Sequence, residues 1–296
     1  MMSGSCVKLE DLGLEENDRM GDEDYMAIFG ALEAGSCPSA KRLTLGYALL
    51  SVQSATALGH ALRSGNCHHL QWLDLWGAFD DRDASLHVLQ AIQQGGGGAM
   101  PSLLHLNMSD TRMDQAHGRV LGEAIGGGAL PELEDLILSS NRSLGDGGVV
   151  PIMVGLKGGG CRHLKRLDFG HVGMGPQGGH ALARALASGH LNCLQDFWVH
   201  RNGGVEDEAM AEVVKGLRER RQLRELDVRC TGMGVISGQA LVQALQDKAW
   251  PDLEWLLASR NEHLLSDEGV VVGLVEVLER RAELCPRLER IDFYRT

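Results

Sequence analysis

The feature that most constrains this chain is a short apolar pattern, L-x-x-L-x-L, that recurs along its whole length. Successive copies begin 29 to 35 residues apart, and the fourth and sixth positions are apolar in every copy. Such a period indicates a repeat protein, in which each unit buries its apolar face only by stacking on its neighbours. We therefore expect a single domain over residues 1–296 rather than the two that the length alone suggests. The first positions of the copies are Leu9, Ala40, Leu70, Leu103, Leu133, Leu164, Leu194, Leu223, Leu253 and Leu288.

Each repeat unit combines two kinds of apolar spacing. Its first residues alternate apolar and polar side chains, which predicts a short β-strand with one buried face. Its second half carries helical spacing, as in Leu58, Ala61 and Leu62. Because all units run in the same sense, the strands should form one parallel sheet. Helices are wider than the strand spacing of about 4.8 Å, so the stack should bend into a right-handed horseshoe. The predicted fold is an α/β solenoid of about ten repeats, with strands on the concave face and helices on the convex face.

These units resemble the ribonuclease-inhibitor-like class of leucine-rich repeats, which is also found in NOD-like receptors and Ran GTPase-activating proteins. The resemblance covers residues 7–296 and includes MGDEDYMAIFGAL, LGDGGVVPIMVGL and LSDEGVVVGLVEVL, which lead into helices. The ninth position of this class is often Asn, whose side-chain amide can bond the backbone of the turn leaving the strand. Here it is Asn17, Asn141, Asn202 and Asn261, and from the fifth unit to the ninth the Asn and non-Asn types alternate. The resemblance implies an architecture, which does not by itself fix a function.

Charge and composition limit the classes of partner. The formal charge of −12 repels phosphate backbones, so we expect no nucleic acid and favour a protein partner that carries a basic patch. The N-terminus shows no secretory signal, and no apolar stretch is long enough to span a bilayer, so we expect no membrane association. Seven cysteines in a chain without a signal suggest reduced thiols and a cytoplasmic location, with the nucleus as an alternative.

The residues that could suggest bound groups favour structural roles. Glycine runs at 95–98, 126–128 and 158–160 lie between a helix and the next strand, where glycine supplies left-handed helix ends. Cysteines three residues before the first strand position should form a buried column, although a redox pair between Cys37 and Cys67 stays open. No zinc spacing or catalytic motif is present, so we expect no metal, no cofactor and no enzymatic activity. The cysteine column is Cys6, Cys37, Cys67, Cys161 and Cys285.

Candidate binding residues flank the buried strand leucines and should project from the concave face. Four of the five tryptophans fall at these positions, in a chain with only 4% aromatic residues, and interface energy concentrates in Trp, Tyr and Arg. The alternative is that the tryptophans lie flat on neighbouring strands. Near the N-terminus, Glu10, Asp11, Glu15 and Glu16 should form an acidic lip. The predicted partner-binding residues are Trp72, Trp76, His171, Trp198, Arg201, Arg229, Trp255, Arg260 and Tyr294.

The predicted function is non-enzymatic protein–protein recognition through the concave face. One alternative, which the resemblance allows, is a regulator or activator of a small GTPase, with Arg201, Arg260 and Arg295 as candidate arginines by residue type. A second alternative is the ligand-sensing fragment of a larger NOD-like receptor. Because terminal repeats normally need caps, end-to-end self-association is also expected as one outcome.

Overall fold

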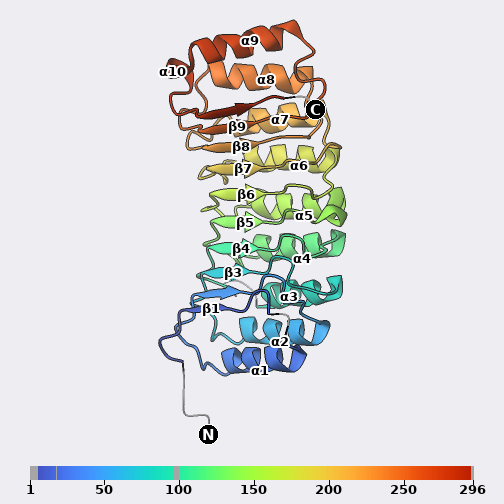
Figure 1. Cartoon of the computed structure of the whole chain (residues 1–296), viewed down its shortest axis with the longest axis vertical. Coiled ribbons are helices and arrows are strands. Elements are labelled where there is room, and N and C mark those ends of the chain that lie inside the picture. The colour runs from blue at the N-terminus through green and yellow to red at the C-terminus, as the bar shows by residue number, and fades with distance from the viewer. Residues whose placement is uncertain (1–5, 18, 96–99, 295–296) are drawn as a thin grey trace.

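The computed structural model describes residues 6–17, 19–95 and 100–294, which form a stack of strand–helix units (Figure 1). Within these ranges, ten three-residue strands form one parallel sheet in the order of the sequence. They are β1 (Asp11–Gly13), β2 (Arg42–Thr44), β3 (Trp72–Asp74), β4 (His105–Asn107), β5 (Asp135–Ile137), β6 (Arg166–Asp168), β7 (Asp196–Trp198), β8 (Glu225–Asp227), β9 (Trp255–Leu257) and β10 (Arg290–Asp292).

A helix follows each of the first nine strands and packs against the helices of the neighbouring units. The helices are α1 (Asp22–Glu33), α2 (Val52–Arg63), α3 (Arg82–Gln94), α4 (Gln115–Gly126), α5 (Gly145–Lys157), α6 (Pro176–Ala187), α7 (Asp207–Leu217), α8 (Val235–Gln246) and α9 (Glu268–Glu279). Two shorter helices are η1 (Arg142–Leu144), which precedes α5, and α10 (Arg281–Leu284), which follows α9.

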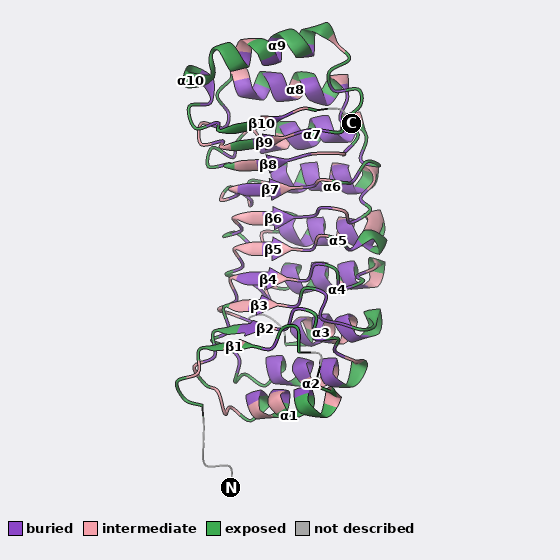
Figure 2. Ribbon diagram, in the orientation of Figure 1, coloured by how far each residue is buried: buried purple, intermediate pink, exposed green. Residues whose placement is uncertain are grey.

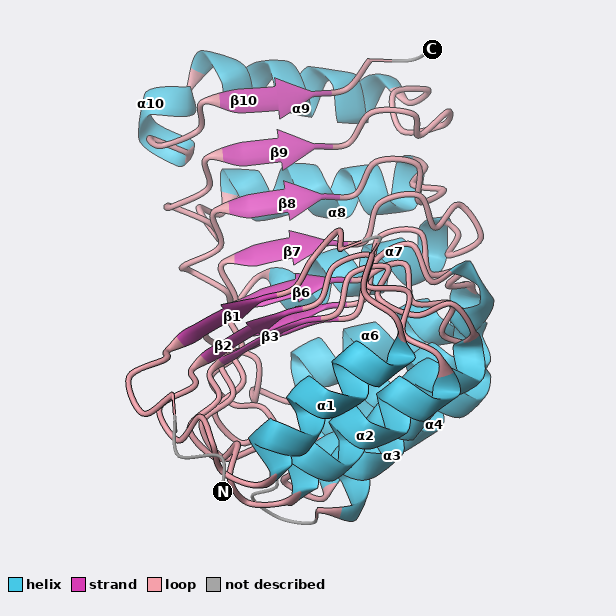
Figure 3. Cartoon of the chain, turned by 60° about the horizontal axis from the view of Figure 1, so that its bottom comes forward, coloured by secondary structure: helices cyan, strands magenta, loops and turns pink. Residues whose placement is uncertain are grey.

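The helices spread farther apart along the stack than the strands do, so the solenoid bends with its strands on the inner side (Figures 1 and 3). This arrangement confirms the predicted α/β horseshoe. The strand side is called the inner face below, and the helix side the outer face.

The strand register follows the apolar pattern in all ten units. The fourth positions pair directly across the sheet, from Leu12 with Leu43 to Leu256 with Ile291. No slip occurs in the two longest units, because moving a strand by one residue would turn its leucines toward solvent. The sequence therefore predicted the register of the strands correctly.

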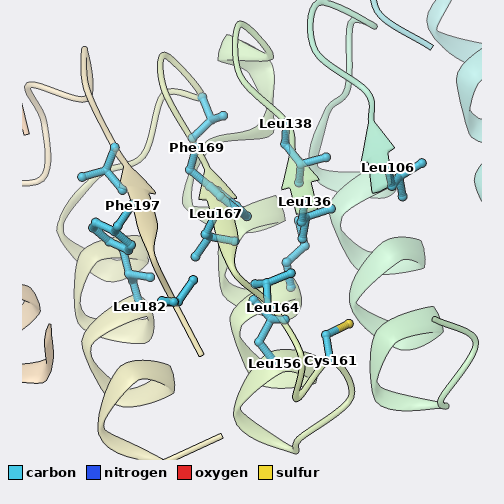
Figure 4. Close-up of a cluster of buried hydrophobic side chains, with 14 of the residues drawn as sticks. Leu106, Leu136, Leu138, Leu156, Cys161, Leu164, Leu167, Phe169, Leu182 and Phe197 are labelled. Atoms are coloured by element: carbon cyan, nitrogen blue, oxygen red, sulfur yellow. The ribbon is translucent and has the colours of Figure 1, made fainter. Parts of the chain in front are cut away.

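The core lies between the sheet and the helices and runs through the whole stack (Figure 2). Leucines at the fourth positions, such as Leu106 and Leu136, are fully buried in the same core as helical residues such as Leu156 and Leu182 (Figure 4). Complete burial of one such side chain contributes roughly 2 kcal/mol. Since every unit adds the same layer, the stacked units together form one continuous core.

Buried asparagines stabilise three of the turns after the strands. The Asn202 amide accepts hydrogen bonds from the backbone N–H groups of Val172 (3.1 Å) and Met174 (3.0 Å) in the preceding unit. It donates to the carbonyls of Phe169 (2.7 Å) and Val199 (2.9 Å). Asn141 and Asn261 make the same set of contacts. The expected amide–backbone bonds to the turn are confirmed at these three positions, where they also join the unit to the one before it, whereas Asn17 bonds only the carbonyl of Glu15 among the described residues.

The expected role of glycine is confirmed where the structure describes the glycine runs, and the buried cysteine column is confirmed at three of its five positions. Gly128 and Gly159 follow helices with φ of 75° and 86°, whereas Gly96–Gly98 lie outside the described residues. In the cysteine column, Cys67, Cys161 and Cys285 are buried, Cys37 is half-buried and Cys6 is exposed. The column is therefore structural in its interior and open at its N-terminal end.

Candidate protein-recognition surface

Trp72 on β3 is packed rather than free. Its ring stacks on the His105 imidazole, with centroids 3.5 Å apart and planes 5° from parallel. The Arg42 guanidinium covers the ring at 4.6 Å from its centroid, and His105 Nδ1 lies 3.0 Å from an Asp135 carboxylate oxygen. For this tryptophan, the alternative of a ring lying flat on its neighbours is the one observed.

Trp198 on β7 is also partly covered. The Arg166 guanidinium lies 5.3 Å from its ring centroid and donates to Asp196 Oδ2 through Nε (3.1 Å) and Nη2 (2.8 Å). Burial alone would lower the pKa of Arg166, but the hydrogen bonds to Asp196 and the charge of Asp135 raise it. The guanidinium therefore stays charged and holds Trp198 in place.

Three other predicted aromatic residues are open to solvent. Trp76, Trp255 and Tyr294 expose 45%, 39% and 53% of their surface. Trp76 packs edge-to-face on the exposed ring of Tyr47, with centroids 4.7 Å apart. Tyr47 was missed among the candidates, although it occupies the same eighth position as His171 and Arg201. The exposed aromatic residues thus form an N-terminal pair and a separate C-terminal group.

A hollow of about 570 Å³ lies at the carboxyl ends of strands β5 to β10, and we call it the cationic hollow. It is lined by Arg142, His171, His200, Arg201, Arg229, Cys230, Ser259, Arg260 and Tyr294. Five of the nine predicted residues therefore come together here, whereas Trp72, Trp76, Trp198 and Trp255 do not line the hollow. Sequence reasoning missed the other four lining residues. Three of them occupy the same seventh and eighth positions that supplied the candidates, and only Arg142 lies beyond them.

The turns beneath the hollow share one backbone conformation, which recurs in each of the first nine repeat units. His171, Arg201 and Arg260 have φ between 56° and 60°, in the left-handed region. Their N–H groups donate to the carbonyls of His200 (2.8 Å), Arg229 (2.8 Å) and Tyr294 (3.1 Å) in the next units. The turns thereby present one residue per unit at a regular spacing.

The arginines of the hollow differ in their pairing. Arg229 donates to both carboxylate oxygens of buried Asp227, through Nε (2.8 Å) and Nη2 (2.5 Å), and these bonds raise its pKa. Arg142, Arg201 and Arg260 are exposed, and none lies within 4.0 Å of a carboxylate in the described ranges. Arg295, the third candidate for GTPase regulation, lies outside those ranges. Three guanidiniums are therefore free to bind a ligand.

The described residues contain neither a membrane-spanning helix nor a cluster of metal-binding side chains. None of their helices is long and apolar enough to cross a membrane. Among the same residues, no three His, Cys, Asp or Glu side chains are grouped so that they could hold a metal ion.

Comparison with known protein families supports the leucine-rich-repeat fold. The family described as "Leucine Rich repeat" matches residues 130–153 and 160–183, which span most of the fifth and sixth units. The chain folds as a leucine-rich-repeat solenoid. No curated protein is significantly similar to it in sequence.

Two solved structures resemble this leucine-rich-repeat chain weakly. One is a chain of the yeast Rad7 and Elc1 complex, at 14% identity and a TM-score of 0.46, covering 95% of this chain and 75% of that one. The other is the C-terminal domain of Caenorhabditis elegans tropomodulin, at 13% identity and a TM-score of 0.31, covering 76% and 95%. At these values neither likeness indicates a function for this chain.

Proposed function

We propose that this chain is a non-enzymatic module that binds a protein partner through its inner face. The observation that supports this most directly is the concentration of solvent-open Trp, Tyr and Arg side chains on that face. Trp76, Trp255 and Tyr294 are exposed, and Arg201 and Arg260 have no carboxylate within 4.0 Å in the described part of the chain. These three residue types dominate the energy of protein interfaces. Leucine-rich-repeat scaffolds are typically used for interaction rather than catalysis.

The two ends of the inner face differ in charge. The acidic lip of Glu10, Asp11, Glu15 and Glu16 lies at the N-terminal units, where Lys41 pairs with Glu10 at 3.0 Å. Opposite signs at the two ends favour one orientation of a partner. The lip suits the basic patch that the net charge of −12 predicts, whereas the cationic hollow suits the opposite sign.

We further propose that the repeats belong to the ribonuclease-inhibitor-like class. The proposed location of the protein is the cytoplasm or the nucleus. The class is supported by the alternation of the turns, because buried Asn141, Asn202 and Asn261 occur in every second unit. Regulation of a small GTPase and a NOD-like receptor fragment gain no support from the comparisons.

Affinity capture from a cell lysate, with mass spectrometry of the bound proteins, tests the proposed function. The inner-face variant combines Trp76→Ser, Trp255→Ser and Arg260→Gly, and the outer-face control combines Val154→Ser, Ile236→Ser and Arg119→Gln. We expect a partner that is retained by the wild-type and control proteins and lost by the inner-face variant. The same proteins bound by all three would contradict recognition by the inner face.

We also propose end-to-end self-association, which is supported by an exposed apolar row on the last long helix. Helix α9 exposes Val272, Val275 and Leu278 by 58%, 48% and 46%, on the side away from the core. A second copy covering this row would remove apolar surface from water. Sedimentation at high concentration should then give a dimer that Val272→Glu with Val275→Glu converts to a monomer and that Val154→Glu leaves intact. A monomeric wild-type protein would exclude this contact.

A further inference from the structure

The cationic hollow gathers positive charge in an otherwise acidic chain. Four guanidiniums and two imidazoles line it, and none of its lining residues carries a carboxylate. Seventh and eighth positions of five successive units supply eight of the lining residues, and Arg142 comes from the unit before them. Exposed cations this close repel one another unless an anion lies between them.

Two polar atoms of the lining are buried without a partner. Ser259 is 1% exposed, and its hydroxyl has no hydrogen bond to any of the described residues. His200 Nδ1 is also buried and unbonded, since the nearest Asp227 oxygen lies 3.5 Å away. Leaving such a group unsatisfied costs about 1–3 kcal/mol. Both residues line the hollow, so its wall contains polar groups that the described residues leave without a hydrogen bond.

The carboxylates nearest the hollow are already engaged. Asp168, Asp227 and Asp292 accept hydrogen bonds from the N–H groups of Gly170 (2.8 Å), Arg229 (3.2 Å) and Tyr294 (3.3 Å). Burial also raises the pKa of Asp168. These side chains fix the turns and do not lie within 4.0 Å of the exposed guanidiniums.

We infer that the cationic hollow binds an acidic segment of the protein partner, with a carboxylate or phosphorylated side chain held between Arg201 and Arg260. This inference rests on the proposed function and names the chemistry of its ligand. The two arginines occupy equivalent positions two strands apart, which separates their backbones by roughly 10 Å. Their long side chains can therefore converge on one oxyanion, with the bidentate geometry that guanidinium groups favour.

A peptide segment fits the hollow better than a free ion or a nucleic acid. About 570 Å³ is much more space than one phosphate group needs. A long polyanion would meet the rest of a chain with a net charge of −12, whereas a short acidic segment contacts the hollow alone.

Fluorescence anisotropy with defined peptides tests the inference. The probes are a fluorescein-labelled hexaglutamate peptide, a phosphoserine peptide of the same length and a neutral glutamine peptide, all at low ionic strength. The test variant is Arg201→Gly with Arg260→Gly, because glycine retains the left-handed φ of 57° and 60°. The control, Arg112→Gly with Arg119→Gln, removes two exposed arginines elsewhere, one of them also left-handed at φ 58°.

Cys230 reports occupancy of the hollow directly. It lines the hollow and is half-buried, whereas Cys193 is half-buried but not part of the lining. Alkylation of both thiols by iodoacetamide can be followed by peptide mass spectrometry. A bound acidic peptide should slow the reaction of Cys230 and leave that of Cys193 unchanged.

The inference predicts saturable binding of at least one acidic peptide, no binding of the glutamine peptide, and protection of Cys230. It also predicts about tenfold or greater weakening in the test variant alone, as expected for lost charge-assisted bonds. Binding of the phosphoserine peptide alone would identify a phosphorylated segment, and binding of both would show that carboxylates suffice. No saturable binding, equal weakening in the control, or an unprotected Cys230 would overturn the inference. A partner captured through the inner face in that case would leave the proposed function standing.

Discussion

At the scale of single residues, the left-handed turns serve the architecture rather than any one site. The eighth residue has φ between 53° and 62° in each of the first nine units, whether it is Glu16, Gly77, Asp110 or Arg260. A non-glycine residue there is strained by about 1–2 kcal/mol. Because the strain is the same in units without candidate residues, it does not mark function. It does make glycine the suitable replacement when a side chain of the hollow is removed.

The buried asparagines should contribute strongly to stability. Asn202→Ala removes five hydrogen bonds and leaves backbone groups of two units unpaired, so we expect a loss of about 2–4 kcal/mol. Urea unfolding followed by circular dichroism measures this loss. Asn17→Ala is the control, because Asn17 is exposed and its side chain bonds only the Glu15 carbonyl, at 3.3 Å, among the described residues. Equal effects of the two substitutions would contradict the role of the buried amides.

The buried cysteines should be unreactive in the folded protein. Burial raises the pKa of Cys67 to about 11, of Cys161 to about 12 and of Cys285 to about 11. Since the thiolate is the reactive form, alkylation at pH close to 8 should spare these three thiols and modify Cys6. Peptide mass spectrometry before and after unfolding in urea checks this. Rapid modification of Cys161 in the folded state would mean that the interior of the cysteine column is accessible to solvent.

At the scale of elements, α4 and α5 pack backbone against backbone. A Cβ atom at Gly118 would lie 2.3 Å from Gly148 Cα, and one at Gly122 would lie 2.4 Å from the Pro151 carbonyl oxygen. Only glycine permits this approach. The sequence did not predict it, because the glycine runs indicated helix ends while these isolated glycines showed no pattern of their own.

The close helix pair gives a matched test. Gly122→Ala should destabilise the protein by about 1–3 kcal/mol, because the added methyl group has no space. Gly126→Ala places its methyl 3.7 Å from Gly155 Cα, so it should be neutral or slightly stabilising. Thermal unfolding of both variants distinguishes them. A neutral Gly122→Ala would show that α4 and α5 can move apart at little cost.

At the scale of the whole molecule, the sequence predicted the fold well and the candidate surface only in part. The apolar period determines the register, so it correctly predicted that Trp255 lies on the exposed side of β9. It could not show that Trp72 stacks on His105, since that contact depends on side-chain conformations in neighbouring units. The net charge likewise concealed the cationic hollow, because a sum over the chain does not show where its arginines gather.

Hydrogen–deuterium exchange with a captured partner tests recognition by the inner face most directly. Peptides covering the turns after β7, β8 and β9, at residues 198–203, 228–233 and 257–262, should exchange more slowly in the complex. Helices α4 and α5 on the outer face should be unchanged. Protection confined to the outer helices, with no change in these turns, would contradict the account.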